Sequence, residues 1–118
     1  MSESHEPQPS FMKSLFFGQI REDLVFPYPR PKQEVAEAVR MILDTLDKFG
    51  KDQVKAAEWD EKGAMPREIV SYMAELGVLG IAVPEELGGL GLPQSGYARV
   101  MQELARLDGA LAVTAGAH

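Results

Sequence analysis

The sequence of 118 residues contains no cysteine, which excludes disulfides, thiolate metal sites and cysteine nucleophiles. It holds only two histidines, His5 near the start and His118 at the last position. A zinc site needs about four clustered ligands and a Ser-His-Asp triad needs a positioned histidine, so we expect neither. Long apolar runs are missing too, and none approaches the ~20 residues that span a bilayer. The sequence therefore predicts no metal site and no transmembrane segment.

Positive charge is also scarce. The chain has 12 basic and 18 acidic residues, a formal net charge of -6, and no run of lysine or arginine. This balance disfavours nucleic-acid binding and anionic membrane surfaces. The first nine residues carry Glu3 and Glu6 but no arginine and no apolar run, which disfavours a secretory signal or a mitochondrial transit peptide. We therefore expect a cytoplasmic protein built as one globular domain.

Residues 1–32 are predicted to be a flexible tail followed by an aromatic and proline-rich strap. Phe11–Phe17 is an aromatic cluster that precedes Gly18, and a short helix would place several of its apolar side chains on one side. We expect this segment to dock on the body of the protein; the alternative is a membrane or partner contact. Leu24–Pro31 contains three prolines, which favour extended backbone over helix. An SH3-ligand interpretation of these prolines is the alternative, but their spacing is a weak signal for it.

Residues 33–118 are predicted to form an all-α domain of about five helices, because apolar residues recur there at helical spacing. Gly50, Gly63 and Gly77 are interpreted as the residues that end the first three helices. Pro66 suits the first turn of the third helix. The expected helices cover residues 33–50, 52–61, 66–76, 97–107 and 109–117.

Two short segments between the third and fourth helices follow no helical period. Val78–Val83 is an apolar run that we expect to be buried and extended, without belonging to a proper sheet. Glu85–Leu92 contains three glycines and is the densest turn signal in the chain. Its spacing matches neither the dinucleotide-binding nor the P-loop glycine pattern, so it does not predict a phosphate site.

The last predicted helix, Gly109–Ala117, contains no charged residue. A helix that is apolar all round belongs inside a larger body, and nothing later in the chain covers it. We therefore expect a domain that is incomplete at its C-terminal end; the alternative is a final helix that docks last in a complete protein.

Several sequence motifs follow one another along the chain. Phe17–Ile20 and Val25–Pro29 precede the first long helix, and Trp59–Gly63 precedes the third. The string Glu75–Leu92 contains Leu-Gly, Pro-Glu and Gly-Gly-Leu-Gly in uninterrupted succession. From Phe11 to His118 the sequence resembles the N-terminal all-helical domain of the flavin-dependent acyl-CoA dehydrogenases. The Phe-Pro-Tyr-Pro strap and Thr114–His118 are similar to the very-long-chain branch in particular.

This resemblance implies an oxidoreductase of fatty-acid β-oxidation that removes the α-proton of an acyl-CoA with a glutamate and passes the β-hydride to FAD. It implies that both the glutamate and most flavin contacts lie in later domains, so no catalytic or cofactor-binding residue is assigned here and the chain alone is expected to be inactive. The implied partners are fatty acyl-CoA, an electron-transfer flavoprotein, the remaining dehydrogenase domains and further copies in a homo-oligomer.

The resemblance also implies that this domain forms one wall of the acyl-chain channel. Ala112 and Gly116 are four residues apart, hence on one helical face, and match positions where medium-chain members carry larger polar side chains. Small residues there predict a deep channel and long acyl chains, although they also allow close helix packing. The candidate channel residues are Tyr97, Met101, Leu104, Ala112 and Gly116.

Three alternatives stay open at this point. The chain is a genuine short subunit that pairs with a flavin-bearing chain, or a non-catalytic helical module that binds a lipid tail or partner. It is otherwise the equivalent domain of an acyl-CoA oxidase, whose helical domain is similar.

Overall fold

A computed structural model describes residues 9–118 of the chain. The predicted tail over residues 1–8 lies outside the described residues. The chain divides into two compact units, one ending at Arg30 and the other running from Pro31 to His118. This division lies beside the boundary predicted between residues 32 and 33, and each unit is described by itself below.

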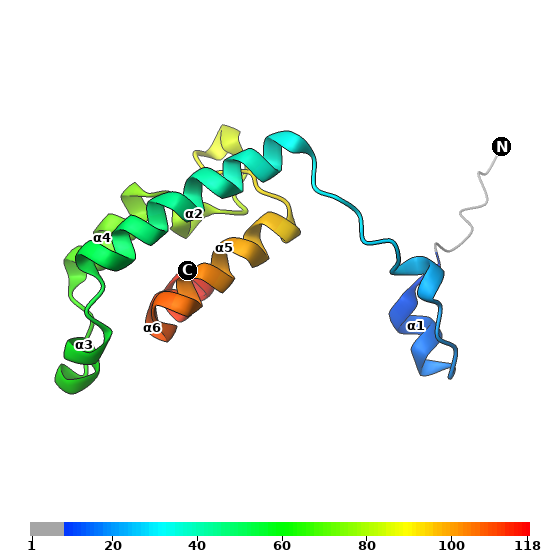
Figure 1. The fold of residues 1–118 in the computed structure, drawn as a ribbon, viewed down its shortest axis with the longest axis horizontal. Coiled ribbons are helices and arrows are strands. Elements are labelled where there is room, and N and C mark those ends of the chain that lie inside the picture. Colours follow the sequence, from blue (N-terminus) through cyan, green and yellow to red (C-terminus); the bar gives the residue numbers. More distant parts are fainter. Residues whose placement is uncertain (1–8) are drawn as a thin grey trace. The chain divides into compact units, whose positions relative to one another are not determined.

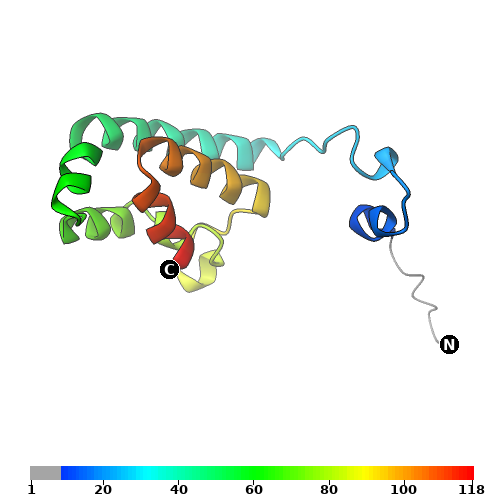
Figure 2. The same ribbon diagram turned by 90° about the horizontal axis from the view of Figure 1, so that it is seen from below.

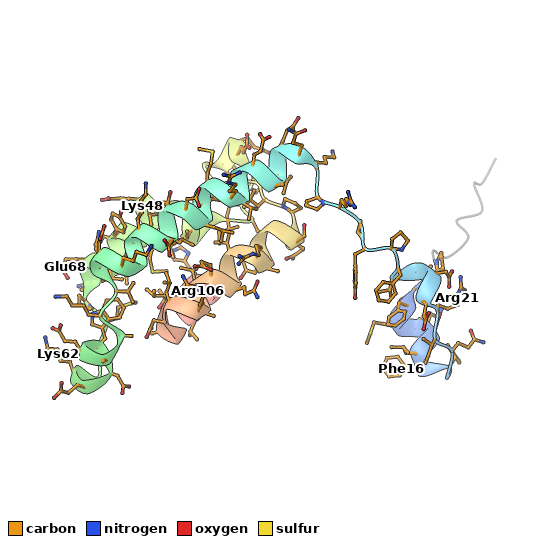
Figure 3. All side chains as sticks on the ribbon, in the orientation of Figure 1. Phe16, Arg21, Lys48, Lys62, Glu68 and Arg106 are labelled. Carbon is orange, nitrogen blue, oxygen red and sulfur yellow. The ribbon has the colours of Figure 1, made fainter. Side chains whose placement is uncertain are left out.

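The first unit contains one short helix and a turn. Helix α1 (Phe11–Phe16) begins after Ser10, whose side chain accepts a hydrogen bond from the backbone N–H of Lys13 at 3.3 Å. The short 3₁₀ helix η1 (Glu22–Leu24) follows, and a turn and bend continue through Pro27, so the first part of the predicted strap is not extended. Phe16 is 88% exposed on this unit's own surface (Figure 3). The docking of the aromatic cluster stays a prediction.

The second unit is helical, and residues 9–118 contain no strand, which confirms the predicted all-α class (Figure 1). Its first helix is the longest, and five of the six α-helices belong to this unit. Two 3₁₀ helices, η2 and η3, lie between α4 and α5. The helices run as follows: α2 Gln33–Gln53, α3 Ala56–Lys62, α4 Arg67–Glu75, η2 Val78–Gly80, η3 Glu85–Leu87, α5 Gln94–Leu107 and α6 Gly109–Ala117.

The core lies where these helices meet. Helix α5 packs along α2, and α6 turns back beside α5 and reaches η2; both views show α2 and α5 side by side (Figures 1 and 2). Burying the apolar stripes of these helices is the main source of stability for such a small unit. The side chains with almost no exposed surface are Leu46, Phe49, Met73, Val78, Ile81, Val100, Leu104 and Leu111.

Gly50 does not end the first long helix, and this prediction is wrong. Helix α2 continues through it to Gln53, and α3 accordingly begins at Ala56 instead of residue 52. The reason is close packing: a side chain at Gly50 would collide with the Leu107 side chain of α5. Glycine is needed here because two helices cross closely. Gly77 does behave as predicted, with φ 77° after α4.

The apolar run Val78–Val83 is not extended, so this expectation is also wrong. It forms η2 and a turn, with Val78 and Ile81 buried and Val83 39% exposed. The run has no partner strand among residues 9–118, so its backbone groups bond locally and to the next loop. The amides of Leu90, Gly91 and Leu92 donate to the carbonyls of Gly80, Val83 and Ile81, respectively, at 2.8–3.0 Å.

Candidate functional site

Helices α5 and α6 are joined by one residue, Asp108. Its backbone is extended, with φ -166° and ψ 137°, which breaks the helix and lets the chain turn back. Its side chain accepts a hydrogen bond from the backbone N–H of Ala110 at 2.8 Å, and so caps the start of α6. The cap fixes the two helices that carry every predicted channel residue.

Helix α6 buries one side only. Leu111 and Ala115 point into the core, with 0% and 8% of their surfaces exposed. On the other side Val113 is 71% exposed, and Gly116 and Ala117 are exposed as well. No other described residue covers the second side, so the burial of this helix inside a larger body stays a prediction. The result is an exposed helix face without a charged residue.

Three of the predicted channel residues come together. The first carbon of a side chain at Gly116 would lie 3.3 Å from the terminal methyl carbon Cε of Met101 and 3.8 Å from the hydroxyl oxygen of Tyr97. Both α5 side chains are partly buried against the core. Helical spacing brings Met101 one turn beyond Tyr97 on the same side of α5. The edge of α6 at Gly116 is thus bordered by a phenol and a flexible thioether.

The other two predicted residues lie deeper. Ala112 is partly buried and packs against the core, one turn before Gly116 on α6. Leu104 is fully buried, with 0% of its surface exposed. It packs within the core of this chain, while Met101 and Tyr97 retain exposed surface.

Helix α5 carries a buried charge, Glu103, that was not predicted from the sequence. Glu103 is only 8% exposed. Its carboxylate accepts a hydrogen bond from Arg106 Nε at 2.9 Å and lies 3.8 Å from Arg99. Arg106 also lies 3.6 Å from Asp47, which links α5 to α2. The signal was present in the sequence, as arginines four residues before and three after a glutamate.

This ionic group is a structural link between helices. The hydrogen bond from Arg106 lowers the pKa of Glu103 most, burial of the carboxyl opposes that shift, and the positive charges of Arg106 and Arg99 add to it. Glu103 therefore stays ionised at neutral pH. A carboxylate that is already paired with arginine is a poor proton acceptor, so nothing here nominates it as a catalytic base.

The hollows of the helical unit lie elsewhere on its surface. One runs between α2 and α5, with a volume of about 240 Å³, and includes Val35, Val39 and Leu43 among its apolar lining. Another lies along α2 beside Leu76 and Val78. Neither contains a predicted channel residue, so the Gly116 region is an open helix face in this chain and not a closed pocket.

Within residues 9–118, no three histidine, aspartate or glutamate side chains gather in a way that could hold a metal ion. No helix in the same range has the length and apolar character needed to cross a bilayer.

The glycine turn after η3 does not fit a flavin phosphate. A phosphate cradle needs backbone N–H groups that point into open space. Here the amide of Gly89 donates to the carbonyl of Pro84, and that of Gly91 donates to Val83. A side chain at Gly89 would collide with the Val83 backbone, so the turn is filled by its own chain. The turn therefore supports the fold and offers no cofactor site.

Comparison with known proteins identifies a family with these features of sequence and fold. Residues 36–118 match the family model of the acyl-CoA dehydrogenase N-terminal domain. The chain therefore belongs to the acyl-CoA dehydrogenase family and carries its N-terminal domain. The resemblance stated from the motifs is confirmed.

Two relatives show how much of a longer protein this chain matches. The very long-chain specific acyl-CoA dehydrogenase, mitochondrial, of Macaca fascicularis is 34% identical over 110 residues, which are 92% of this chain and 17% of that protein. The probable acyl-CoA dehydrogenase FadE10 of Mycobacterium tuberculosis (strain ATCC 25618 / H37Rv) is 33% identical over 116 residues, 98% of this chain and 18% of that protein. The chain thus spans less than a fifth of the length of these curated relatives.

Proposed function

We propose that this chain is the part of a flavin-dependent acyl-CoA dehydrogenase that forms one wall of the acyl-chain channel in fatty-acid β-oxidation. The observation that carries the proposal is the exposed, uncharged face of α6, bordered by Met101 and Tyr97 of α5. An acyl tail is bound by burying it against apolar surface, and it needs no charged partner along its length. Membership of the family supplies the reaction class.

The proposal divides the channel residues into two groups. Ala112, Gly116, Met101 and Tyr97 would border the tail, because each keeps exposed surface on or beside α6. Leu104 would support the wall from behind, since it is fully buried in the core. Small residues at 112 and 116 would leave room for a long acyl chain.

The chemical groups of the reaction are assigned outside these residues. In the proposal the glutamate base, most contacts to FAD and the docking surface for an electron-transfer flavoprotein belong to other domains of the complete enzyme. This chain contributes binding and the exclusion of water from the tail. The 118 residues alone are accordingly expected to be inactive, and the complete enzyme is expected to be a homo-oligomer.

The test uses the full-length enzyme with Ala112→Gln and Gly116→Glu together. Larger polar side chains on this face should shorten the channel, so kcat/KM for palmitoyl-CoA should fall relative to octanoyl-CoA. This ratio is expected to change by about tenfold or more, because the shorter channel no longer buries one to several methylenes of the longer tail. Unchanged specificity and rate with palmitoyl-CoA would show that this face does not border the tail.

The rival functions are separated by the coding sequence and by the electron acceptor. A frame that continues into flavin-binding and glutamate-bearing domains supports the proposal, while an adjacent frame that encodes them supports a short subunit. Reduction of oxygen in place of a flavoprotein would identify an acyl-CoA oxidase. A cytoplasmic location stays a prediction, which cell fractionation tests; the printed names of the mammalian relatives place those proteins in mitochondria.

A further inference from the structure

Part of the space beside Gly116 is occupied by the end of the Met101 side chain. A side chain at this position would place its first carbon 3.3 Å from Met101 Cε, which is closer than carbon atoms usually approach. The end of the Met101 side chain therefore borders the position that a larger residue at 116 would take. A small residue at 116 does not by itself leave an open recess here, because a side chain from α5 reaches into that space.

Methionine is suited to a space that must change its size. Its side chain is unbranched, has three rotatable bonds and adapts to irregular apolar surroundings. Met101 is partly buried against the core, and its terminal methyl lies beside Gly116. Leu104, one turn further along α5, has no exposed surface and no such freedom.

We propose that Met101 is a specificity-determining residue, whose side chain sets the space available to the acyl tail beside Gly116. This inference rests on the proposed function. Met101 fills the space when the bound tail is short, and it rotates away when a longer tail needs the room. The identity of residue 101 then matters for chain length as much as the small residue at 116.

The experiment compares Met101→Ala and Met101→Phe in the full-length enzyme. The ratio of kcat/KM for docosanoyl-CoA to that for octanoyl-CoA is expected to rise about tenfold with alanine, because the space opens, and to fall about tenfold with the larger and stiffer phenylalanine. The matched control is Met41→Ala on α2, where the methionine is 71% exposed and lies outside the 4 Å surroundings of a side chain at Gly116. It should leave the ratio unchanged.

A second measurement does not depend on turnover. Dissociation constants of non-oxidisable 3-thia-acyl-CoA analogues, measured by calorimetry, should shift in the same direction as the kinetic ratio. Gly116→Ala should act like Met101→Phe, because both crowd the same space. The double variant Met101→Ala with Gly116→Ala should recover the wild-type ratio, which a merely structural role of Met101 would not produce.

The outcomes are distinct. Ratios that stay at the wild-type value in both residue-101 variants overturn the inference while leaving the proposed function intact. A wild-type enzyme without acyl-CoA dehydrogenation overturns the proposed function instead. Thermal unfolding checks whether each variant folds. If Met101→Ala does not fold, the volume-conserving Met101→Leu replaces it in combination with Gly116→Ala. Additive effects of these two substitutions on the kcat/KM ratio would overturn the inference, and non-additive effects would support it.

Discussion

Helices α5 and α6 are neighbours in sequence and space but expose different kinds of side chain to water. Helix α5 buries Val100 and Leu104 and places the charged ends of Arg99 and Arg106 at its surface. Helix α6 also buries one side, yet its other side exposes Val113 and glycine instead of charges. A helix face that evolved to meet solvent carries polar groups, so the α6 face is built to be covered. The contrast separates the outer surface of the domain from the surface proposed to meet a substrate tail.

The largest expected effect on the free energy of unfolding comes from the buried side of α5, and the exposed side of α6 provides the comparison. Leu104→Ala removes a fully buried side chain and should lower the free energy of unfolding by about 3 kcal/mol. Val113→Ala should change it by less than about 0.5 kcal/mol, because that side chain is 71% exposed. Urea unfolding of the purified chain measures both. Equal losses would mean that the exposed face of α6 is covered in solution.

A smaller effect contrasts two helical glycines. Gly50→Ala should lower the free energy of unfolding by about 1 kcal/mol, because the collision with Leu107 outweighs the gain in helix propensity. Gly109→Ala should raise it by a few tenths of a kcal/mol, since nothing lies within 4 Å of the added carbon. Thermal unfolding of both variants checks the opposite signs. A stabilising Gly50→Ala would contradict the close crossing of α2 and α5.

A third effect, about as large as that of Gly50→Ala, concerns the charge that α5 buries and α6 lacks. The pKa of Glu103 is lowered in the folded chain, so its contribution is present above the unfolded value of about 4.3 and is lost as pH falls through the folded value. Glu103→Gln should cost about 1 kcal/mol at neutral pH, and this difference should vanish in acid. Unfolding curves from neutral pH downward measure it, with exposed Glu68→Gln as the control (Figure 3). A cost that is independent of pH would rule out the ionic link.

Local sequence signals predicted most of the fold. Apolar residues at helical spacing predicted α2, α4 and α5, and Gly77 ended α4 as expected. Gly50 was misjudged because a helix stop and a helix crossing both need a residue without a side chain. The difference lies in Leu107, which is distant in sequence and close only after folding. The backbone of Val78–Val83 was misjudged because its hydrogen-bond partners lie in the following loop.

The candidate site was predictable to a smaller extent. Spacing placed Ala112 and Gly116 on one face of a helix, and the motif string identified the family. Spacing alone could not show that Met101 reaches Gly116, because that contact depends on the angle between two helices joined at Asp108. The burial of Glu103 likewise depends on how α5 packs along α2.

The loop between α4 and α5 has a consequence for hydrogen exchange. Its acidic residues Glu85 and Glu86 are exposed, which by itself suggests a segment that opens easily. The amides of Leu90, Gly91 and Leu92 nevertheless donate to backbone carbonyls from Gly80 to Val83. These amides should exchange with deuterium slowly, at rates nearer those of helix interiors than those of frayed ends. At this loop, therefore, exposed acidic side chains lie over a backbone whose amides stay hydrogen-bonded.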